Sequence, residues 1–251
     1  MVEESLAKTR SEARGLILAG RVLVDDVPVD KCGPRVAPEA SVRVRGGGRR
    51  FASRGGEKIA SALEQLSFDP SGLSCLDVGA GTGGFTDCLL KNGARRVLAV
   101  DVGYGQLDLR LRNDPRVSVL EKTNARHLSS DQIPWPVDLV VMDVSFISAR
   151  LLLPGLRELA PNAQWLVMVK PQFELGRGRV GKGGVVRDPA LRNEAVETVA
   201  ATARSLGLSE RGRAESRLPG PKGNREIFLW LAPSEPVEAP EADALRGPDP
   251  V

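Results

Sequence analysis

The fold is decided by residues 76–85, which read LDVGAGTGGF. An apolar run that enters a glycine-rich turn and continues into a helical pattern is typical of a buried strand followed by a helix. Glycine permits the sharp turn and lets a ligand approach the backbone more closely than a Cβ would allow. The spacing of Gly79, Gly81 and Gly84 fits a dinucleotide-binding fingerprint, the nucleoside pocket of methyltransferases, or a tight turn without a ligand.

Strand-like and helix-like patterns alternate on both sides of this turn. Strands are predicted at residues 74–77, 96–101, 117–120, 139–143, 165–170 and 226–231, and helices at 57–66, 84–92, 151–159 and 190–206. Several strand runs are almost continuously apolar, which indicates a parallel sheet covered on both faces. The predicted fold class is therefore α/β, with a Rossmann-like sheet and helices on both of its faces.

Residues 1–46 have the pattern of a separate small α+β module. A capping-box spacing begins at Thr9, an apolar face follows, and Gly20 ends the predicted helix. Short extended runs follow at 22–24, 27–29 and 41–45, with Asp25-Asp26 as a turn between the first two. We divide the chain into this module, a basic linker (47–53), a main domain (54–232) and an acidic, proline-rich tail (233–251) predicted to be disordered.

Composition and charge limit the function classes. The 251 residues carry a net charge of only +3, yet residues 41–58 hold six basic residues against one acid. This segment suits a polyanionic partner, although a solvated basic linker would have the same composition. The three cysteines lack C-x-x-C spacing and His127 is the only histidine, so we expect neither a metal site nor a histidine triad. Since no signal pattern or long apolar run is present, we expect a cytoplasmic protein without a membrane span.

Polar residues recur where the predicted strands end, which is the edge at which open α/β sheets bind ligands. Asp101 follows Asp77 by 24 positions, close to the spacing of a carboxylate that binds ribose hydroxyls, and Asn124 could meet an adenine edge. Four further charged residues could converge on one cleft: Lys58, Asp143, Lys170 and Glu226. Charge pairing would permit their partial burial, and a desolvated lysine with cationic neighbours can act as a general base near neutral pH.

Eight ordered motifs carry a resemblance to a known family. They are SRGGEK (53–58), LDVGAGTGGFTDCLL (76–90), AVDVGYGQLD (99–108), TNAR (123–126), DLVVMDVSFIS (138–148), VKPQFE (169–174), GKGGVVRDP (181–189) and GPKGNRE (220–226). With them the chain resembles the TlyA-type family, which is similar to FtsJ-type ribose methyltransferases and is often labelled hemolysin. Residues 5–46 resemble the second half of that family's S-four-type RNA-binding domain, whose first helix has no counterpart here.

The resemblance implies an S-adenosylmethionine-dependent 2′-O-methyltransferase that acts on cytidine riboses of ribosomal RNA, free or in ribosomal subunits. It implies a Lys-Asp-Lys-Glu tetrad at Lys58, Asp143, Lys170 and Glu226, in which we assign Lys170 as the general base. The cofactor would be bound by Asp77, Gly79, Ala80, Gly81, Thr82, Gly83, Phe85, Asp101, Asn124 and Asp143. The candidates for RNA contact are Arg10, Arg14, Arg21, Arg49, Arg50, Arg54, Arg177, Arg179 and Lys182. The oligomeric state and the target nucleotide stay open.

Three other functions remain at this point. An NAD-dependent oxidoreductase fits the glycine spacing, but Asp77 directly before the loop and the lysines at the rim disfavour it. A non-catalytic ribosome-binding or assembly factor would keep the pocket without using the tetrad. The hemolysin label suggests membrane lysis, although the sequence has neither a spanning segment nor a strongly amphipathic basic helix.

Overall fold

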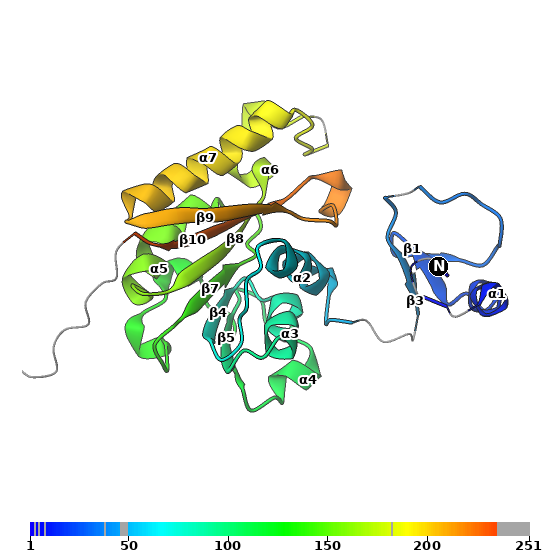
Figure 1. The fold of residues 1–251 in the computed structure, drawn as a ribbon, viewed down its shortest axis with the longest axis horizontal. Coiled ribbons are helices and arrows are strands. Elements are labelled where there is room, and N and C mark those ends of the chain that lie inside the picture. The colour runs from blue at the N-terminus through cyan, green and yellow to red at the C-terminus, as the bar shows by residue number, and fades with distance from the viewer. Residues whose placement is uncertain are drawn as a thin grey trace, which may run out of the picture. The chain divides into compact units, whose positions relative to one another are not determined.

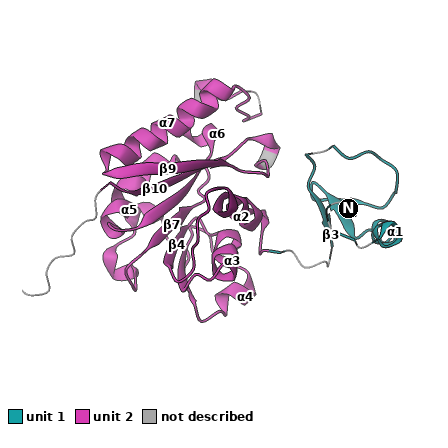
Figure 2. Cartoon of the chain, in the orientation of Figure 1, with its two compact units in different colours: residues 1–50 teal, residues 51–251 magenta. Residues whose placement is uncertain are grey.

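The computed structural model describes residues 1–234, apart from residues 3, 5, 8, 38, 46–49 and 182 and the side chains of 177 and 221. The chain forms two compact units, residues 1–50 and residues 51–251, coloured separately in Figure 2. The expected tail therefore lies outside the described residues from position 235 onward, whereas its first residue, Pro233, closes a strand of the second unit.

The first unit is a helix with a small antiparallel sheet. Helix α1 (Arg10–Leu18) has Thr9 as its N-cap, and the Thr9 hydroxyl accepts a hydrogen bond from the Glu12 backbone N–H at 3.1 Å. Strands β1 (Val22–Val24), β2 (Val27–Val29) and β3 (Val42–Val44) pair in the order β2-β1-β3. Asp25 and Asp26 both have positive φ, as a two-residue turn between right-twisted strands requires. The predicted helix, turn and strands of this unit are confirmed.

The second unit is a seven-stranded sheet in the order β6-β5-β4-β7-β8-β10-β9 (Figure 1). Its strands are β4 (Ser74–Val78), β5 (Arg96–Val100), β6 (Val117–Leu120), β7 (Leu139–Met142), β8 (Gln164–Val169), β9 (Leu208–Glu215) and β10 (Ile227–Pro233). The strands from β4 to β8 are mutually parallel, but β10 is antiparallel to both β8 and β9. The expectation of a parallel sheet is therefore wrong at β10, which runs opposite to both of its neighbours, and β9 was not predicted.

Helices cover both faces of this sheet, as predicted. One face packs against α5 (Leu153–Leu159) and α7 (Pro189–Ser205), and its core includes Trp165 and Leu229. The other packs against α2 (Arg54–Gln65), α3 (Gly84–Lys91) and α4 (Leu109–Arg112). Helix α7 begins with residues that favour a helix start: the Asp188 carboxylate accepts from Ala190 N–H at 2.8 Å, and Pro189 is the first helical residue.

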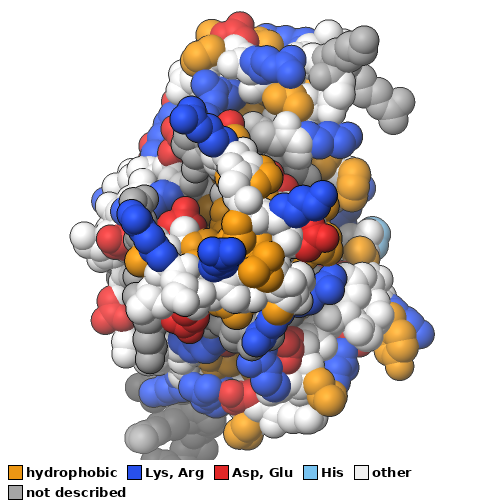
Figure 3. Space-filling view, turned by 90° about the vertical axis from the view of Figure 1, so that its right-hand side faces the viewer, with side chains coloured by type: hydrophobic (Ala, Val, Ile, Leu, Met, Phe, Trp, Pro, Cys, Tyr) orange, Lys and Arg blue, Asp and Glu red, His pale blue; other side chains and the backbone are white. Residues whose placement is uncertain are grey.

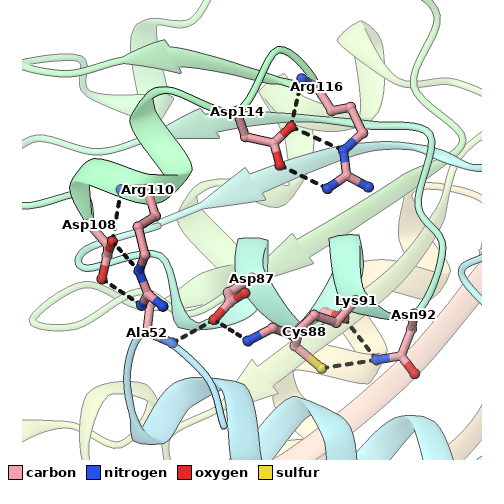
Figure 4. A network of polar contacts seen from close by, with 9 residues as sticks. All are labelled: Ala52, Asp87, Cys88, Lys91, Asn92, Asp108, Arg110, Asp114 and Arg116. Atoms are coloured by element: carbon pink, nitrogen blue, oxygen red, sulfur yellow. Dashed lines mark hydrogen bonds and ion pairs between the residues drawn. The ribbon is translucent and has the colours of Figure 1, made fainter. Parts of the chain in front are cut away.

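The entry into α2 is fixed to α3. Phe51 and Ala52, which the sequence division assigned to the linker, are buried in the core of the second unit. The Asp87 carboxylate of α3 accepts from the Ala52 backbone N–H at 2.8 Å and pairs with Lys91 at 3.0 Å (Figure 4). Helix α2 consequently begins three residues earlier than predicted, with Ser53 as its N-cap.

Candidate active site

The glycine-rich turn lies between β4 and α3 and is pressed against the end of β7. Gly79 has a φ of +84°, and a Cβ at this position would lie 2.4 Å from the Asp143 backbone oxygen. Ala80 and Phe85 are buried beside it, whereas Thr82 is exposed. At Gly81 an added Cβ would find no heavy atom closer than the Gly79 oxygen, at 4.0 Å. The loop is thus open at Gly81, which suits the close approach of a nucleoside to the backbone there.

Asp77 lies beneath this loop and not on its surface. One carboxylate oxygen accepts hydrogen bonds from the Thr86 N–H at 3.0 Å and the Thr86 hydroxyl at 2.6 Å, which fixes the first turn of α3 to β4. The other oxygen has no hydrogen-bond partner among the described residues. Burial raises the pKa of Asp77 from 3.8 to about 7. The charges of Asp143 and Asp101 raise it too, whereas the hydrogen bonds from Thr86 lower it.

Asp101 follows β5 and is half-buried at the same edge. Its carboxylate accepts from Gly81 N–H at 2.8 Å and from Gly103 N–H at 2.6 Å, so it connects the glycine turn to the next loop. A carboxylate held here suits the hydroxyl donors of a ribose. Asn124 is exposed after β6, where its side-chain oxygen accepts from Arg126 N–H at 3.0 Å. The loop and this carboxylate therefore fit a nucleoside cofactor such as S-adenosylmethionine.

The predicted tetrad residues form two ion pairs at this edge. Lys170, directly after β8, pairs with Asp143 after β7, with 2.6 Å between Nζ and Oδ1. Lys58 of α2 pairs with Glu226, directly before β10, and both side chains are almost completely buried. Since Ile227 is opposite Val169 in the antiparallel ladder, Glu226 and Lys170 occupy facing backbone positions just beyond that pair. The reversed direction of β10 is what places a residue preceding a strand at this edge.

Two residues beside the Lys170–Asp143 pair were not predicted as site residues. Lys170 also donates to the Ser145 hydroxyl at 2.8 Å. Phe146 is 92% exposed, has a φ of +66° and lies 5.3 Å from the Phe173 ring. A bulky residue in the left-handed region costs about 1–3 kcal/mol, and such strain clusters at functional sites. The motif DVSFIS contained the only available signal, an apolar aromatic residue directly after the charged strand end.

The residues predicted to contact RNA differ in exposure and in their hydrogen-bond partners. Arg10, Arg14 and Arg21 of the first unit and Arg50 are exposed. Arg54 instead donates to the Pro219 backbone oxygen at 3.2 Å, and Arg179 forms a two-bond ion pair with Glu194. Arg49, Lys182 and the side chain of Arg177 lie outside the described residues.

The surface carries charges of both signs. Lysine and arginine side chains are spread over the face shown in Figure 3, with acidic and apolar side chains between them. Within the described part of the chain, no group of three or more His, Cys, Asp or Glu side chains is arranged to hold a metal ion. None of the described helices combines the length and apolar character needed to cross a membrane.

The fold and the site together define a nucleoside-binding α/β domain of the methyltransferase type. Comparison with known proteins agrees: residues 51–232 match the FtsJ-like methyltransferase family, and residues 1–42 match the S4 domain. The chain therefore belongs to the FtsJ-like methyltransferase family, with an S4 domain ahead of the catalytic unit. This membership sets it apart from the NAD-dependent oxidoreductases that share the glycine spacing.

Individual relatives cover most of the chain. The 16S/23S rRNA (cytidine-2′-O)-methyltransferase TlyA of Mycobacterium tuberculosis is 49% identical over 233 residues, 92% of this chain and 87% of the relative. Hemolysin A of Brachyspira hyodysenteriae is 40% identical over 90% of this chain and 94% of its own. A solved structure described as a hemolysin from Streptococcus thermophilus has a TM-score of 0.75 at 36% identity, covering 92% of this chain and 85% of that one.

Proposed function

We propose that the protein transfers a methyl group from S-adenosylmethionine to the 2′-hydroxyl of cytidine in ribosomal RNA, with Lys170 as the general base. The observation that carries this proposal is the set of contacts around Lys170. Asp143 and Ser145 accept hydrogen bonds from Nζ of Lys170 at 2.6 and 2.8 Å. The remaining position on Nζ would face the 2′-hydroxyl and take up its proton once the amine is neutral.

The other site residues have supporting roles. The Gly79–Gly83 turn, Asp101 and Asn124 would hold S-adenosylmethionine, and Asp77 would support the turn from below. Bound S-adenosylmethionine supplies a methyl group on a sulfonium that is already activated for transfer. Lys58 would orient the 2′-hydroxyl while Glu226 holds the Lys58 ammonium. The chain's own part in the reaction is then alignment and proton removal.

The RNA would be held mainly by contacts to its backbone. The S4 domain carries exposed Arg10, Arg14 and Arg21, and phosphate contacts of this kind give affinity without sequence choice. The exposed ring of Phe146, three residues after Asp143, would stack on an unpaired base, as aromatic side chains do in single-stranded RNA recognition. The target nucleotide would leave its stack to reach Lys170.

The proposal is tested by single-turnover transfer of labelled methyl from S-adenosylmethionine to purified ribosomal subunits, followed by mapping of ribose methylation. We expect Lys170→Met to lower the rate by about 100-fold or more, since a general base contributes on the order of 10²–10⁴. The matched control is Lys91→Met, which breaks a similar ion pair with Asp87 on α3. Absence of ribose methylation with the unaltered protein would favour the assembly-factor alternative instead.

A further inference from the structure

Two short segments bear the proposed base and its partner, and they are linked to each other along their length. The first runs from Asp143 after β7 to Ala149, and the second runs from Lys170 through α6 (Pro171–Glu174). Lys170 joins their near ends through Asp143 and Ser145. The Phe146 and Phe173 rings, 5.3 Å apart, join their middles. Glu174 joins their far ends.

The contacts of Glu174 are unusually complete for a residue outside the ion pairs. Its side chain is only 2% exposed. One carboxylate oxygen accepts from the Ala149 backbone N–H at 2.8 Å, and the other accepts from the Ser148 hydroxyl at 2.5 Å. The Arg150 guanidinium, 3.5 Å away, is 38% exposed. A buried carboxylate is retained at a cost in desolvation, so these contacts need a reason beyond filling space.

The backbone between Asp143 and Ala149 explains why the Glu174 contacts are needed. Phe146 has a φ of +66°, a conformation that a bulky side chain adopts only when its surroundings enforce it. The segment leaves the sheet at Asp143, packs Val144 and Ile147 against the core, and is hydrogen-bonded to Glu174 at Ser148 and Ala149. Release of the Glu174 end would let Phe146 relax, and Ser145, the residue directly before it, would move with it. The second acceptor of the Lys170 amine would then be displaced.

We infer that Glu174 is a positioning residue for methyl transfer, which fixes the Ser145–Phe146 segment and through it the orientation of the Lys170 amine. The inference rests on the proposed function, because it assigns Lys170 the role of the base. Glu174 itself does not contact the Lys170 amine in the structure. Its effect should therefore appear in the chemical step and should depend on the presence of Lys170.

The test uses four variants of the full chain: Glu174→Ala, Glu174→Gln, Lys170→Met and the double variant Glu174→Ala/Lys170→Met. We expect Glu174→Ala to lower the single-turnover rate by about 10- to 100-fold, because a misplacement near 1 Å can cost that much. Affinity for S-adenosylmethionine should stay within about twofold, since Glu174 lies outside the loop that would hold it. Glu174→Gln should recover most of the rate, because its amide can accept from Ala149 N–H and donate to the Ser148 hydroxyl.

The double variant separates positioning from general stability. If Glu174 acts through Lys170, the double variant should be no slower than Lys170→Met alone. Independent, multiplicative losses would overturn the inference, as would an unchanged rate in Glu174→Ala. Should Glu174→Ala not fold, Ser148→Ala carries the same test: a several-fold loss that vanishes in the Lys170→Met background supports the inference, and an unchanged rate overturns it.

Amide hydrogen exchange gives a readout that does not require activity. Exchange in residues 149–152, whose amides donate to Glu174, Ser148 and Ala149, should be faster in Glu174→Ala than in the unaltered protein, with the strands of the sheet unchanged. Faster exchange together with no ribose methylation by the unaltered protein would reject the proposed function while leaving the structural link in place. Unchanged exchange in residues 149–152 would reject the link itself.

Discussion

At the scale of single residues, Asp77 shows how a buried carboxyl shapes the glycine turn. It is completely buried, and among the described residues only Thr86 donates hydrogen bonds to it. Burial raises its pKa from 3.8 to about 7. In the unfolded chain the same carboxyl ionises at its ordinary pKa. Between about pH 4 and pH 7 the folded state therefore binds more protons than the unfolded state, and this group's contribution to stability falls as the pH rises.

We predict that Asp77→Asn removes this dependence. The difference in unfolding free energy between the variant and the unaltered protein should shift in favour of the variant from pH 4 to pH 7 and then level off. Each unit of pKa difference corresponds to about 1.4 kcal/mol. Urea unfolding at pH 4.5, 6 and 8 measures this difference in unfolding free energy. The control is Asp69→Asn, because Asp69 lies on an exposed turn. A constant difference across this range would contradict the raised pKa.

The sequence indicated which charged residues reach the sheet edge, because Asp143 and Lys170 follow apolar runs and Glu226 precedes one. It anticipated the two lysines and two acids as a group, and the structure arranges them as two ion pairs. It did not indicate Ser145, Phe146 or Glu174. Their importance depends on a backbone torsion and on contacts across 25 and 26 positions, which no local pattern encodes.

At the scale of elements, α2 and α3 approach each other at glycines. Gly84 is the first residue of α3, and a Cβ there would lie 2.1 Å from the Ser53 hydroxyl oxygen and 2.8 Å from the Gly56 backbone nitrogen. The serine side chain can rotate away, but the backbone nitrogen belongs to a packed helix. Gly56 of α2 is closely packed on its own account, because a Cβ there would lie 2.3 Å from the Phe51 Cβ.

We predict that Gly84→Ala lowers the unfolding free energy by about 1–3 kcal/mol, the usual cost of overpacking. Gly155→Ala is the matched control, because Gly155 lies in α5 with no atom within 4 Å of an added Cβ. That control should be neutral or more stable by up to about 1 kcal/mol, as expected for replacing a helical glycine. Urea denaturation of both variants decides the matter; equal stabilities would refute close packing at Gly84.

The elements that the sequence did not predict have a common cause. Strand β9 reads LSERGRAE, and only two of its residues, Leu208 and Ala214, are buried because it lies at the edge of the sheet. A strand with one charged side chain after another lacks the alternation that identifies strands. Helices α4 and α6, with four residues each, are too short to show a helical period. The parallel strands were predictable because they are buried on both faces and therefore read as continuous apolar runs.

At the scale of the whole molecule, the reactivity of the three thiols distinguishes the two units. Cys32 of the first unit is exposed, whereas Cys75 and Cys88 of the second are buried. Burial, with the nearby charges of Asp138 and Asp77, raises the pKa of Cys75 to about 12. A thiol that is both buried and protonated does not react as a nucleophile.

We predict that one thiol per chain reacts rapidly with an aromatic disulfide reagent in the native protein, and that all three react in denaturant. Cys32→Ser should lower the native count to zero, and Cys88→Ser should leave it at one. The absorbance of the released thiolate gives the counts directly. Rapid reaction of two or three thiols in the native protein would mean that the second unit opens readily.

The antiparallel course of β10 also has a consequence for biosynthesis. A ribosome emits the chain from its amino end, so Lys58, Asp143 and Lys170 all emerge before Glu226. Strands β4 to β8 can assemble while Glu226 is still untranslated, yet Lys58 then lacks the carboxylate that neutralises it in the finished enzyme. The nascent protein should therefore become active only when the β9–β10 hairpin has been translated and has docked onto β8. Its parallel strands can form well before that point.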